Sequence, residues 1–327
     1  MNETRFDVIA IGNAIVDVLA QSDDEQLAQL KLAKGTMALI DDEAADRLYD
    51  LMGPGVETSG GSAANTVAGI AGLGGRAAFI GKVADDQLGE VFAHDIRAVG
   101  VTFNTPPATD GPSTARCLIF VTPDAERTMQ TFLGVSSLLG PSDVDEDLVR
   151  ASKVLYLEGY LWDQPAAKEA FVTGARMAAA AGRKVSFTLS DPFCVERHRG
   201  EFLDLIHNHV DILFANENEI IALFETDSFE EALDQIKGHC EVAVLTRSEK
   251  GSVVVSADGV IVIDPEKVHV VDTTGAGDAY AAGFLYGYTQ GRDLRACGRL
   301  GSVLAAEVIS HYGARPVADL QELTAKV

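Results

Sequence analysis

The stretch DTTGAGD, residues 272–278, decides how the rest of the chain is interpreted. An apolar run ends just before it and the small-residue segment AYAAGFL follows it, which indicates a strand, a tight loop and the start of a buried helix. A helix N-terminus carries unpaired N–H groups and partial positive charge, so it attracts anions. Gly275 and Gly277 let a phosphate approach the backbone closely. The loop therefore predicts an anion site.

Asp278 is the unusual residue of this loop, because a carboxylate repels a phosphate. One role open to it is that of a general base, which takes a proton from a hydroxyl group that attacks the phosphate. The other is that of a helix cap with no part in chemistry. The loop alone leaves both open, because short Gly-x-Gly loops are common.

The composition excludes several classes of protein. The 327 residues are 47% hydrophobic, enough for a large core, and carry a formal net charge of −23. That charge argues against nucleic acid or an anionic membrane as partner, since both need basic patches. The four widely spaced cysteines predict reduced thiols rather than disulfides or a zinc site. With no signal-peptide pattern and no apolar run of about 20 residues, we expect a cytoplasmic protein.

Strand-like apolar runs alternate with helical patterns along most of the chain, which predicts an α/β fold with a doubly wound, mostly parallel sheet flanked by helices. The pattern changes at residues 105–133, where a β-hairpin with a turn at 122–126 is expected. We assign this segment and residues 14–52 to a small, discontinuous β-sheet insert. Residues 1–13, 53–104 and 134–327 then form the α/β domain.

Polar residues follow several of the predicted strands, at the sheet edge where ligands bind in such folds. Asp17 follows the first strand, and Gly61, Ser62 and Asn65 open a helix to which a ligand can come close. The alternative for Asp17 is an ordinary turn or strand-edge acid, and the alternative for the second segment is a helix whose small residues serve packing only.

Two further clusters follow later strands. Asn216 and Glu219 offer oxygens that suit Mg²⁺, although they equally form a helix-capping box. Thr246, Ser248 and Gly251 lie in a turn that either contacts nucleotide phosphates or is only a β-turn. Together with the anion loop, these clusters predict phosphoryl transfer from a nucleotide to an alcohol, which needs positioning, a metal, charge stabilisation and a base.

Two other phosphate-binding motifs do not occur in the chain. It has no G-x-x-x-x-G-K-[ST] sequence, so it is not a P-loop protein. A Rossmann fingerprint would need Gly or Ala at position 280, where Tyr280 stands.

The segment DTTGAGDAYAAGF closely resembles the C-terminal signature of the ribokinase-like (PfkB) family of carbohydrate and nucleoside kinases. GGSAAN at 60–65 is similar to the family's N-terminal signature, Asn216 and Glu219 match its metal motif, and residues 246–251 match its T-x-G-x-x-G turn with Ser248 in place of the middle glycine. The resemblance spans essentially the whole chain.

This resemblance implies roles for the loop residues. Asp278 would be the base, and the backbone amides around Gly275, Ala276 and Gly277 would form the anion hole. The β insert would close over the substrate as a lid. ATP and Mg²⁺ would be used, and K⁺ would be held by carbonyl groups near Asp272 and Thr274.

Four segments resemble the adenosine kinases of the family: GNAIVD at 12–17, LSDPF at 189–193, VDILFANENE at 210–219 and the tail at 297–316. That likeness implies that Asp17 binds the ribose hydroxyls, with Asn13 in the same pocket, and that Tyr160 or Trp162 stacks on the base. We therefore expect ATP-dependent phosphorylation of a nucleoside 5′-hydroxyl, with adenosine as first choice, by a monomer or homodimer. A sugar kinase of ribokinase or fructokinase type is the alternative enzyme, and a nucleoside-binding regulator is the alternative class.

Overall fold

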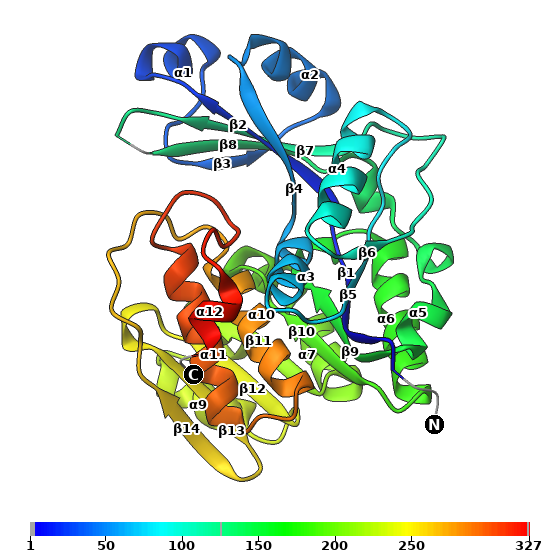
Figure 1. Ribbon diagram of the computed structural model, residues 1–327, viewed down its shortest axis with the longest axis vertical. Coiled ribbons are helices and arrows are strands. Elements are labelled where there is room, and N and C mark those ends of the chain that lie inside the picture. Colours follow the sequence, from blue (N-terminus) through cyan, green and yellow to red (C-terminus); the bar gives the residue numbers. More distant parts are fainter. Residues whose placement is uncertain (1–3, 125, 326) are drawn as a thin grey trace.

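The computed structural model describes residues 4–124, 126–325 and 327. Residues 1–3, 125 and 326 lie outside this range. One of them, residue 125, belongs to the predicted turn at 122–126, so this part of the turn is not described. The described chain forms one large sheet flanked by helices and a smaller sheet above one of its edges (Figure 1).

The large sheet has nine strands among the described residues, in the order β14-β13-β12-β11-β10-β9-β1-β5-β6. The strands from β12 to β6 run parallel, and the hairpin β13–β14 adds an antiparallel edge. The predicted doubly wound, mostly parallel sheet is confirmed. Their bounds are β1 Phe6–Ile11, β5 Ala77–Ile80, β6 Thr102–Phe103, β9 Ser152–Glu158, β10 Lys184–Thr188, β11 Ile212–Asn216, β12 Val242–Thr246, β13 Ser252–Ser256 and β14 Gly259–Ile263.

Strand β1 shows why helices cover both faces of this sheet. Its side chains alternate, so Val8 and Ala10 pack on one face whereas Ile9 and Ile11 pack on the other. Residues of α3, α4, α10 and α11 belong to the first core and residues of α5 to α9 to the second. The helix bounds are α3 Ser62–Gly72, α4 Gln87–Ala98, α5 Glu146–Arg150, α6 Pro165–Ala180, α7 Pro192–His209, α8 Glu217–Phe224, α9 Phe229–Ile236, α10 Ala276–Thr289, α11 Leu294–Val308 and α12 Leu320–Thr324.

The smaller sheet has five strands in the described chain, in the order β3-β8-β7-β2-β4, with two helices beside it. Their bounds are β2 Ile15–Gln21, α1 Asp24–Leu30, β3 Met37–Leu39, α2 Asp42–Leu51, β4 Gly55–Gly60, β7 Ala115–Val121 and β8 Arg127–Phe132. We call this sheet with α1 and α2 the lid.

The lid contains one strand that the sequence placed elsewhere. Residues 53–104 were assigned to the large domain, but β4 pairs antiparallel with β2 in the lid sheet. The sequence GVETSG gives little strand signal, because half of it is Gly or Ser and only Val56 is a large apolar residue. We propose that the boundary lies near Gly61 instead.

Two helices also differ from expectation. Helix α7 begins at Pro192 rather than near residue 199, with a kink at His198 where φ is −124°. Asp191 caps its start by accepting a hydrogen bond from the Cys194 amide. Helix α9 was not predicted, although Ser228 caps it in the same way.

Candidate functional site

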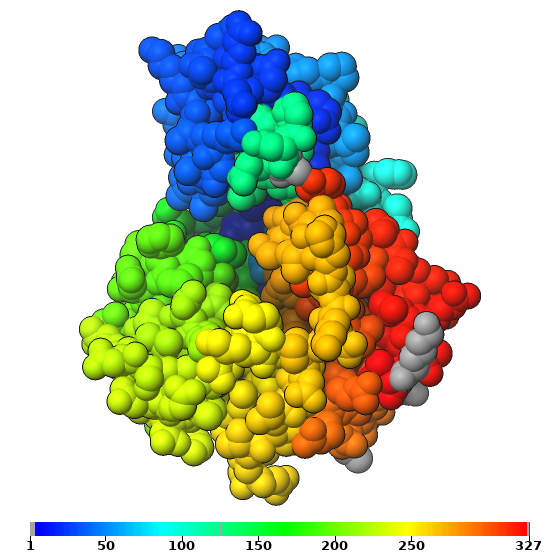
Figure 2. Space-filling model, turned by 90° about the vertical axis from the view of Figure 1, so that its left-hand side faces the viewer, coloured from blue at the N-terminus to red at the C-terminus, as the bar shows by residue number. Residues whose placement is uncertain are grey.

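A cavity of about 1430 Å³ lies between the lid and the carboxyl ends of the parallel strands. Figure 2 shows the hollow below the blue lid, bordered by green and orange surfaces. Among the described residues, the predicted site residues that line it are Asn13, Asp17, Gly61, Ser62, Asn65, Tyr160, Asn216, Glu219, Thr246, Ser248, Gly251, Thr274, Gly275, Ala276, Gly277 and Asp278. Asp272 is the predicted residue that does not line the cavity. The fold thus brings together almost all of the described residues that the sequence predicted as one site.

Asp278 lies in the first turn of α10 and is held by two side chains of α3. Ser62 Oγ donates to its Oδ1 at 2.6 Å and Asn65 Nδ2 donates to its Oδ2 at 3.4 Å. Burial raises the pKa of Asp278 from 3.8 to about 6, although these hydrogen bonds and the positive charge of Arg315 oppose the rise. A half-buried carboxylate with a pKa near 6 is suited to accept a proton at neutral pH.

The two glycines of the loop have different structural duties. Gly275 is the N-cap of α10 with φ of 76°, and a Cβ there would lie 2.5 Å from the carbonyl oxygen of Ala314. A Cβ on Gly277 would have no described heavy atom within 4 Å apart from its chain neighbours and the backbone of α10 itself. No described side chain caps α10, so the first-turn N–H groups of Gly277 and Asp278, two residues that line the cavity, have no side-chain acceptor. The loop therefore has the space and the donors that an anion requires.

Asp17 lies on β2 in the lid wall of the cavity. Burial raises its pKa to about 6, while the positive charges of Arg315 and Arg127 oppose the rise. The glycine pair makes room for it: a Cβ on Gly60 would collide with the Asp17 carboxylate, and one on Gly61, where φ is 99°, with the carbonyl oxygen of Asn13. Gly61 is therefore required by the backbone at this point, whereas Gly60 leaves the Asp17 carboxylate its present position.

Asn216 and Glu219 form the capping box that was the structural alternative for this pair. Asn216 Oδ1 accepts from the Glu219 amide at 2.9 Å, and Glu219 Oε2 accepts from the Asn216 amide at 2.8 Å. Burial and the neighbouring charge of Asp191 raise the pKa of Glu219 to about 7. These oxygens are hard ligands of the type Mg²⁺ prefers, and since Glu219 already accepts hydrogen bonds, they fit an ion held through water.

The turn after β12 has a backbone conformation at residue 248 that explains why the T-x-G-x-x-G motif has glycine at this position. Ser248 has φ of 50°, in the left-handed region that favours glycine, and it stands where the resembling motif has Gly. Gly251 has φ of 81°, and a Cβ on it would collide with the carbonyl oxygen of Ile263. Thr246 and Ser248 both line the cavity.

Asp272 holds the anion loop from behind. Its Oδ1 accepts from the Thr274 amide at 3.0 Å and from the Thr274 hydroxyl at 2.7 Å, and its Oδ2 accepts from the Gly313 amide at 3.1 Å. Arg127 of β8 forms an ion pair with Asp272 at 2.9 Å, with both side chains less than 10% exposed. The lid is thus tied directly to the anion loop. A K⁺ site at the carbonyl groups near Asp272 and Thr274 stays a prediction.

The aromatic side chains at the far end of the cavity differ in exposure. Trp162 is 4% exposed, donates from Nε1 to Glu201 at 2.9 Å and packs on Phe171 and Phe202, so its suggested stacking role is wrong. Tyr160, 36% exposed, and Phe193, 71% exposed, both line the cavity. The lid wall carries the polar residues Asp17 and Thr131, and its other lining residues are apolar: Ile15, Met37, Leu39, Cys117, Ile119 and Met129.

Three residues at or beside this cavity were missed by sequence reasoning. Glu158 directly follows the apolar run VLYL, so the rule that selected Asp17 could have found it. Phe193 lies in a segment that was noted for its resemblance but given no role. Arg315 donates to Asn65 Oδ1 at 3.0 Å and to Ser59 Oγ, on β4 of the lid, at 2.8 Å. No local sequence pattern predicts this contact between the C-terminal tail and the lid.

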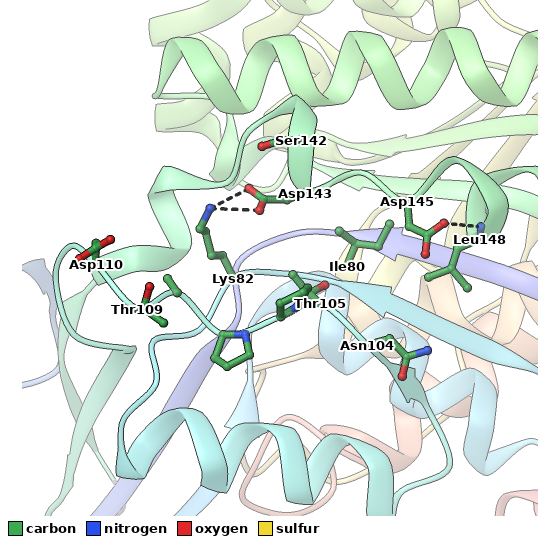
Figure 3. Close-up of a pocket in the computed structure, with 13 residues that line it drawn as sticks. Ile80, Lys82, Asn104, Thr105, Thr109, Asp110, Ser142, Asp143, Asp145 and Leu148 are labelled. Atoms are coloured by element: carbon green, nitrogen blue, oxygen red, sulfur yellow. Dashed lines mark hydrogen bonds and ion pairs between the residues drawn. The ribbon is translucent and has the colours of Figure 1, made fainter.

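A second cavity, of about 610 Å³, lies beside β5 and β6 (Figure 3). Lys82 lines this cavity and forms an ion pair with Asp143, whose two carboxylate oxygens both lie within 3.0 Å of Lys82 Nζ. This pair fixes the 3-10 turn Pro141–Asp143 to the end of β5. Because the cation is already neutralised, this cavity does not resemble a phosphate site.

Residues 32–320 match the family model described as pfkB family carbohydrate kinase. The chain belongs to the pfkB family. A crystal structure of a probable sugar kinase from Rhizobium etli CFN 42 is 53% identical, with a TM-score of 0.91 over 99% of this chain and 98% of that one. The adenosine kinase from Sinorhizobium meliloti is also 53% identical, with a TM-score of 0.90 over 99% of both chains. An ATP-dependent ribose-1-phosphate kinase from Halopiger xanaduensis is 32% identical over 80% of this chain and 85% of its own.

Membership in the pfkB family makes the chain a sugar or nucleoside kinase that acts on small molecules, uses ATP and typically needs Mg²⁺. Throughout the part of the chain that the structure describes, no helix has the length and apolar character to span a membrane.

Proposed function

We propose that this pfkB-family kinase transfers the γ-phosphoryl group of ATP to the 5′-hydroxyl of a nucleoside, with adenosine as the acceptor. The observation that carries the proposal is the two-sided shape of the acceptor end. Asp17 offers a carboxylate to the ribose hydroxyls, while Tyr160, Phe193 and the apolar residues of the lid wall offer surfaces to a flat base. A free sugar would leave those apolar surfaces unused.

The roles proposed for the residues follow from their positions. Asp17, Asn13, Gly61, Ser62 and Asn65 hold the sugar, so that the attacking hydroxyl lies beside Asp278. Asp278 takes its proton. The N–H groups of residues 275–278 stabilise the charge on the transferring phosphoryl group.

At the nucleotide end, Thr246, Ser248 and Gly251 contact the phosphates of ATP. Asn216 and Glu219 hold Mg²⁺ through water, with Asp191 nearby, and the ion neutralises phosphate charge when it is bound. Carbonyl groups near Asp272 and Thr274 hold K⁺.

A sugar kinase is the second candidate, because the chain is 53% identical to a probable sugar kinase and 32% identical to a ribose-1-phosphate kinase. A panel of adenosine, other nucleosides, ribose, ribose 1-phosphate and fructose, followed by ADP release, separates the two. Turnover of a sugar without turnover of adenosine would reject the first candidate. If no compound of the panel causes ADP release, a nucleoside-binding regulator would be favoured.

The base role has its own test. Asp278→Asn keeps the shape of the side chain, and we expect kcat to fall by about 10²–10⁴. Asp163→Asn is the matched control, since Asp163 also lines the cavity but lies at the aromatic end. If Asp278→Asn retains more than about a hundredth of the wild-type kcat, another group is the base.

A further inference from the structure

The lid is joined to the body at points far apart in sequence that meet in space. Residues 12–14 lead from β1 into β2, Gly61 leads from β4 into α3, and the turn Gly134–Leu138 leads out of β8. A fourth connection, residues 104–114, leads from β6 into β7. Any change in lid position must be absorbed at these four connections. Glu158, the last residue of β9, lies beside the first three of them.

Glu158 is hydrogen-bonded to two of these connections directly. Its Oε1 accepts from the Asn13 amide at 2.7 Å and from Asn13 Nδ2 at 3.0 Å, and its Oε2 accepts from the Ala63 amide at 2.7 Å. The third connection is reached through Asn13, whose Oδ1 accepts from Ser136 Oγ at 2.9 Å.

The side chain of Glu158 is fully buried. Gly12 makes room for it, because a Cβ there would lie 2.7 Å from its carboxyl carbon. Burial raises the pKa of Glu158 to about 7, but the three N–H groups favour the charged form. A buried carboxylate that satisfies three donors is costly to remove, since each donor then loses its acceptor.

The same contacts lead to the catalytic base. Ala63 is next to Ser62, whose hydroxyl donates to Asp278, and Asn65 lies one turn further along α3. We infer that Glu158 is a positioning residue that couples the lid connections to the alignment of Asp278. It holds Asn13 and the start of α3 in one arrangement, so that the base is aligned when the lid covers the acceptor. The inference rests on the kinase activity but not on adenosine as the acceptor.

The test compares Glu158→Gln and Glu158→Ala with Leu157→Ala, a control on the same strand whose side chain packs in the core of the opposite face. Glutamine keeps the shape but turns an NH₂ group toward an N–H donor, so we expect about a tenfold loss of kcat/KM, and alanine a loss of about 10². Both should raise the KM for the acceptor. Leu157→Ala should lower the Tm and leave KM within about twofold.

A second readout separates positioning from mere stability. A misaligned lid admits water, so the ratio of ADP released to acceptor phosphorylated should rise above one in the Glu158 variants and stay at one in Leu157→Ala. The acceptor is whichever panel compound the wild type phosphorylates. If folded Glu158→Gln keeps both the wild-type KM and a ratio of one, the inference is wrong.

Hydrogen exchange gives a result that needs no acceptor at all. In Glu158→Gln the amides of Asn13 and Ala63 should exchange faster than in the wild type, while amides in the interior of α6 should not change. Unchanged protection at Asn13 and Ala63 would overturn the inference even if adenosine proves not to be the substrate.

Discussion

Gly277→Ala tests whether a phosphate approaches the start of α10. A Cβ at this position meets no described heavy atom within 4 Å beyond its chain neighbours and the backbone of α10, so the variant should fold with an unchanged or slightly raised Tm. The methyl group would occupy the space next to the free N–H groups. Loss of one such donor lowers kcat by roughly 10²–10³, which corresponds to about 2.7–4 kcal/mol.

Gly275→Ala is the contrasting variant in the same loop. It would force φ of 76° on a residue with a side chain, at about 1–2 kcal/mol, and place a Cβ 2.5 Å from the Ala314 carbonyl oxygen. This variant should therefore lose stability as well as activity. Thermal unfolding and ADP release by a coupled assay, measured on both variants, separate the two effects. A Gly277→Ala enzyme with kcat within about fivefold of the wild type would refute the anion-hole assignment.

Three further predictions concern other parts of the cavity. The kcat/KM should rise with pH through about 6, because Asp278 must be ionised and burial raises its pKa to that value. In Arg315→Gln this rise should move to higher pH, because the charge of Arg315 lowers the pKa of Asp278; a pH profile that does not move would exclude Asp278 as the titrating base. Ser248→Gly should raise the unfolding free energy by about 0.5–2 kcal/mol, measured by denaturant, because relief of the strain at φ of 50°, about 1–3 kcal/mol, outweighs the backbone entropy cost of glycine, about 0.5–1 kcal/mol; no gain would mean that the serine is not strained there. Glu219→Gln should keep the capping box, and hence the Tm, but raise the Mg²⁺ concentration needed for half-maximal activity; an unchanged Mg²⁺ requirement argues against the metal role.

The sequence was sufficient where the signal is local. The apolar runs predict the parallel strands, and the rule that ligands bind at their carboxyl ends brings Asp17, Glu219 and Asp278 to one cavity. It was insufficient where a contact joins distant segments. Neither the pairing of β4 with β2 nor the reach of Arg315 has a local pattern.

The aromatic end shows a different limit. Tyr160 and Trp162 are two residues apart, and composition does not tell which of them faces the cavity. The short turn Gly159–Leu161 turns Trp162 into the core beside Phe171. Side-chain direction in a turn depends on backbone angles that a single sequence does not specify.

The order of strands in the two sheets has a consequence for synthesis on the ribosome. In the lid, Ile15 pairs with Ala115, and in the large sheet Phe6 pairs with Ser152. Strands β1 and β2 each have one early partner, β5 and β4, but the other edge of each strand waits for a partner that is translated much later. Such long-range pairing is slow. Asp278 lies on α10, close to the end of the chain. A nascent chain can thus complete its lid while it still lacks the carboxylate that would make it an enzyme.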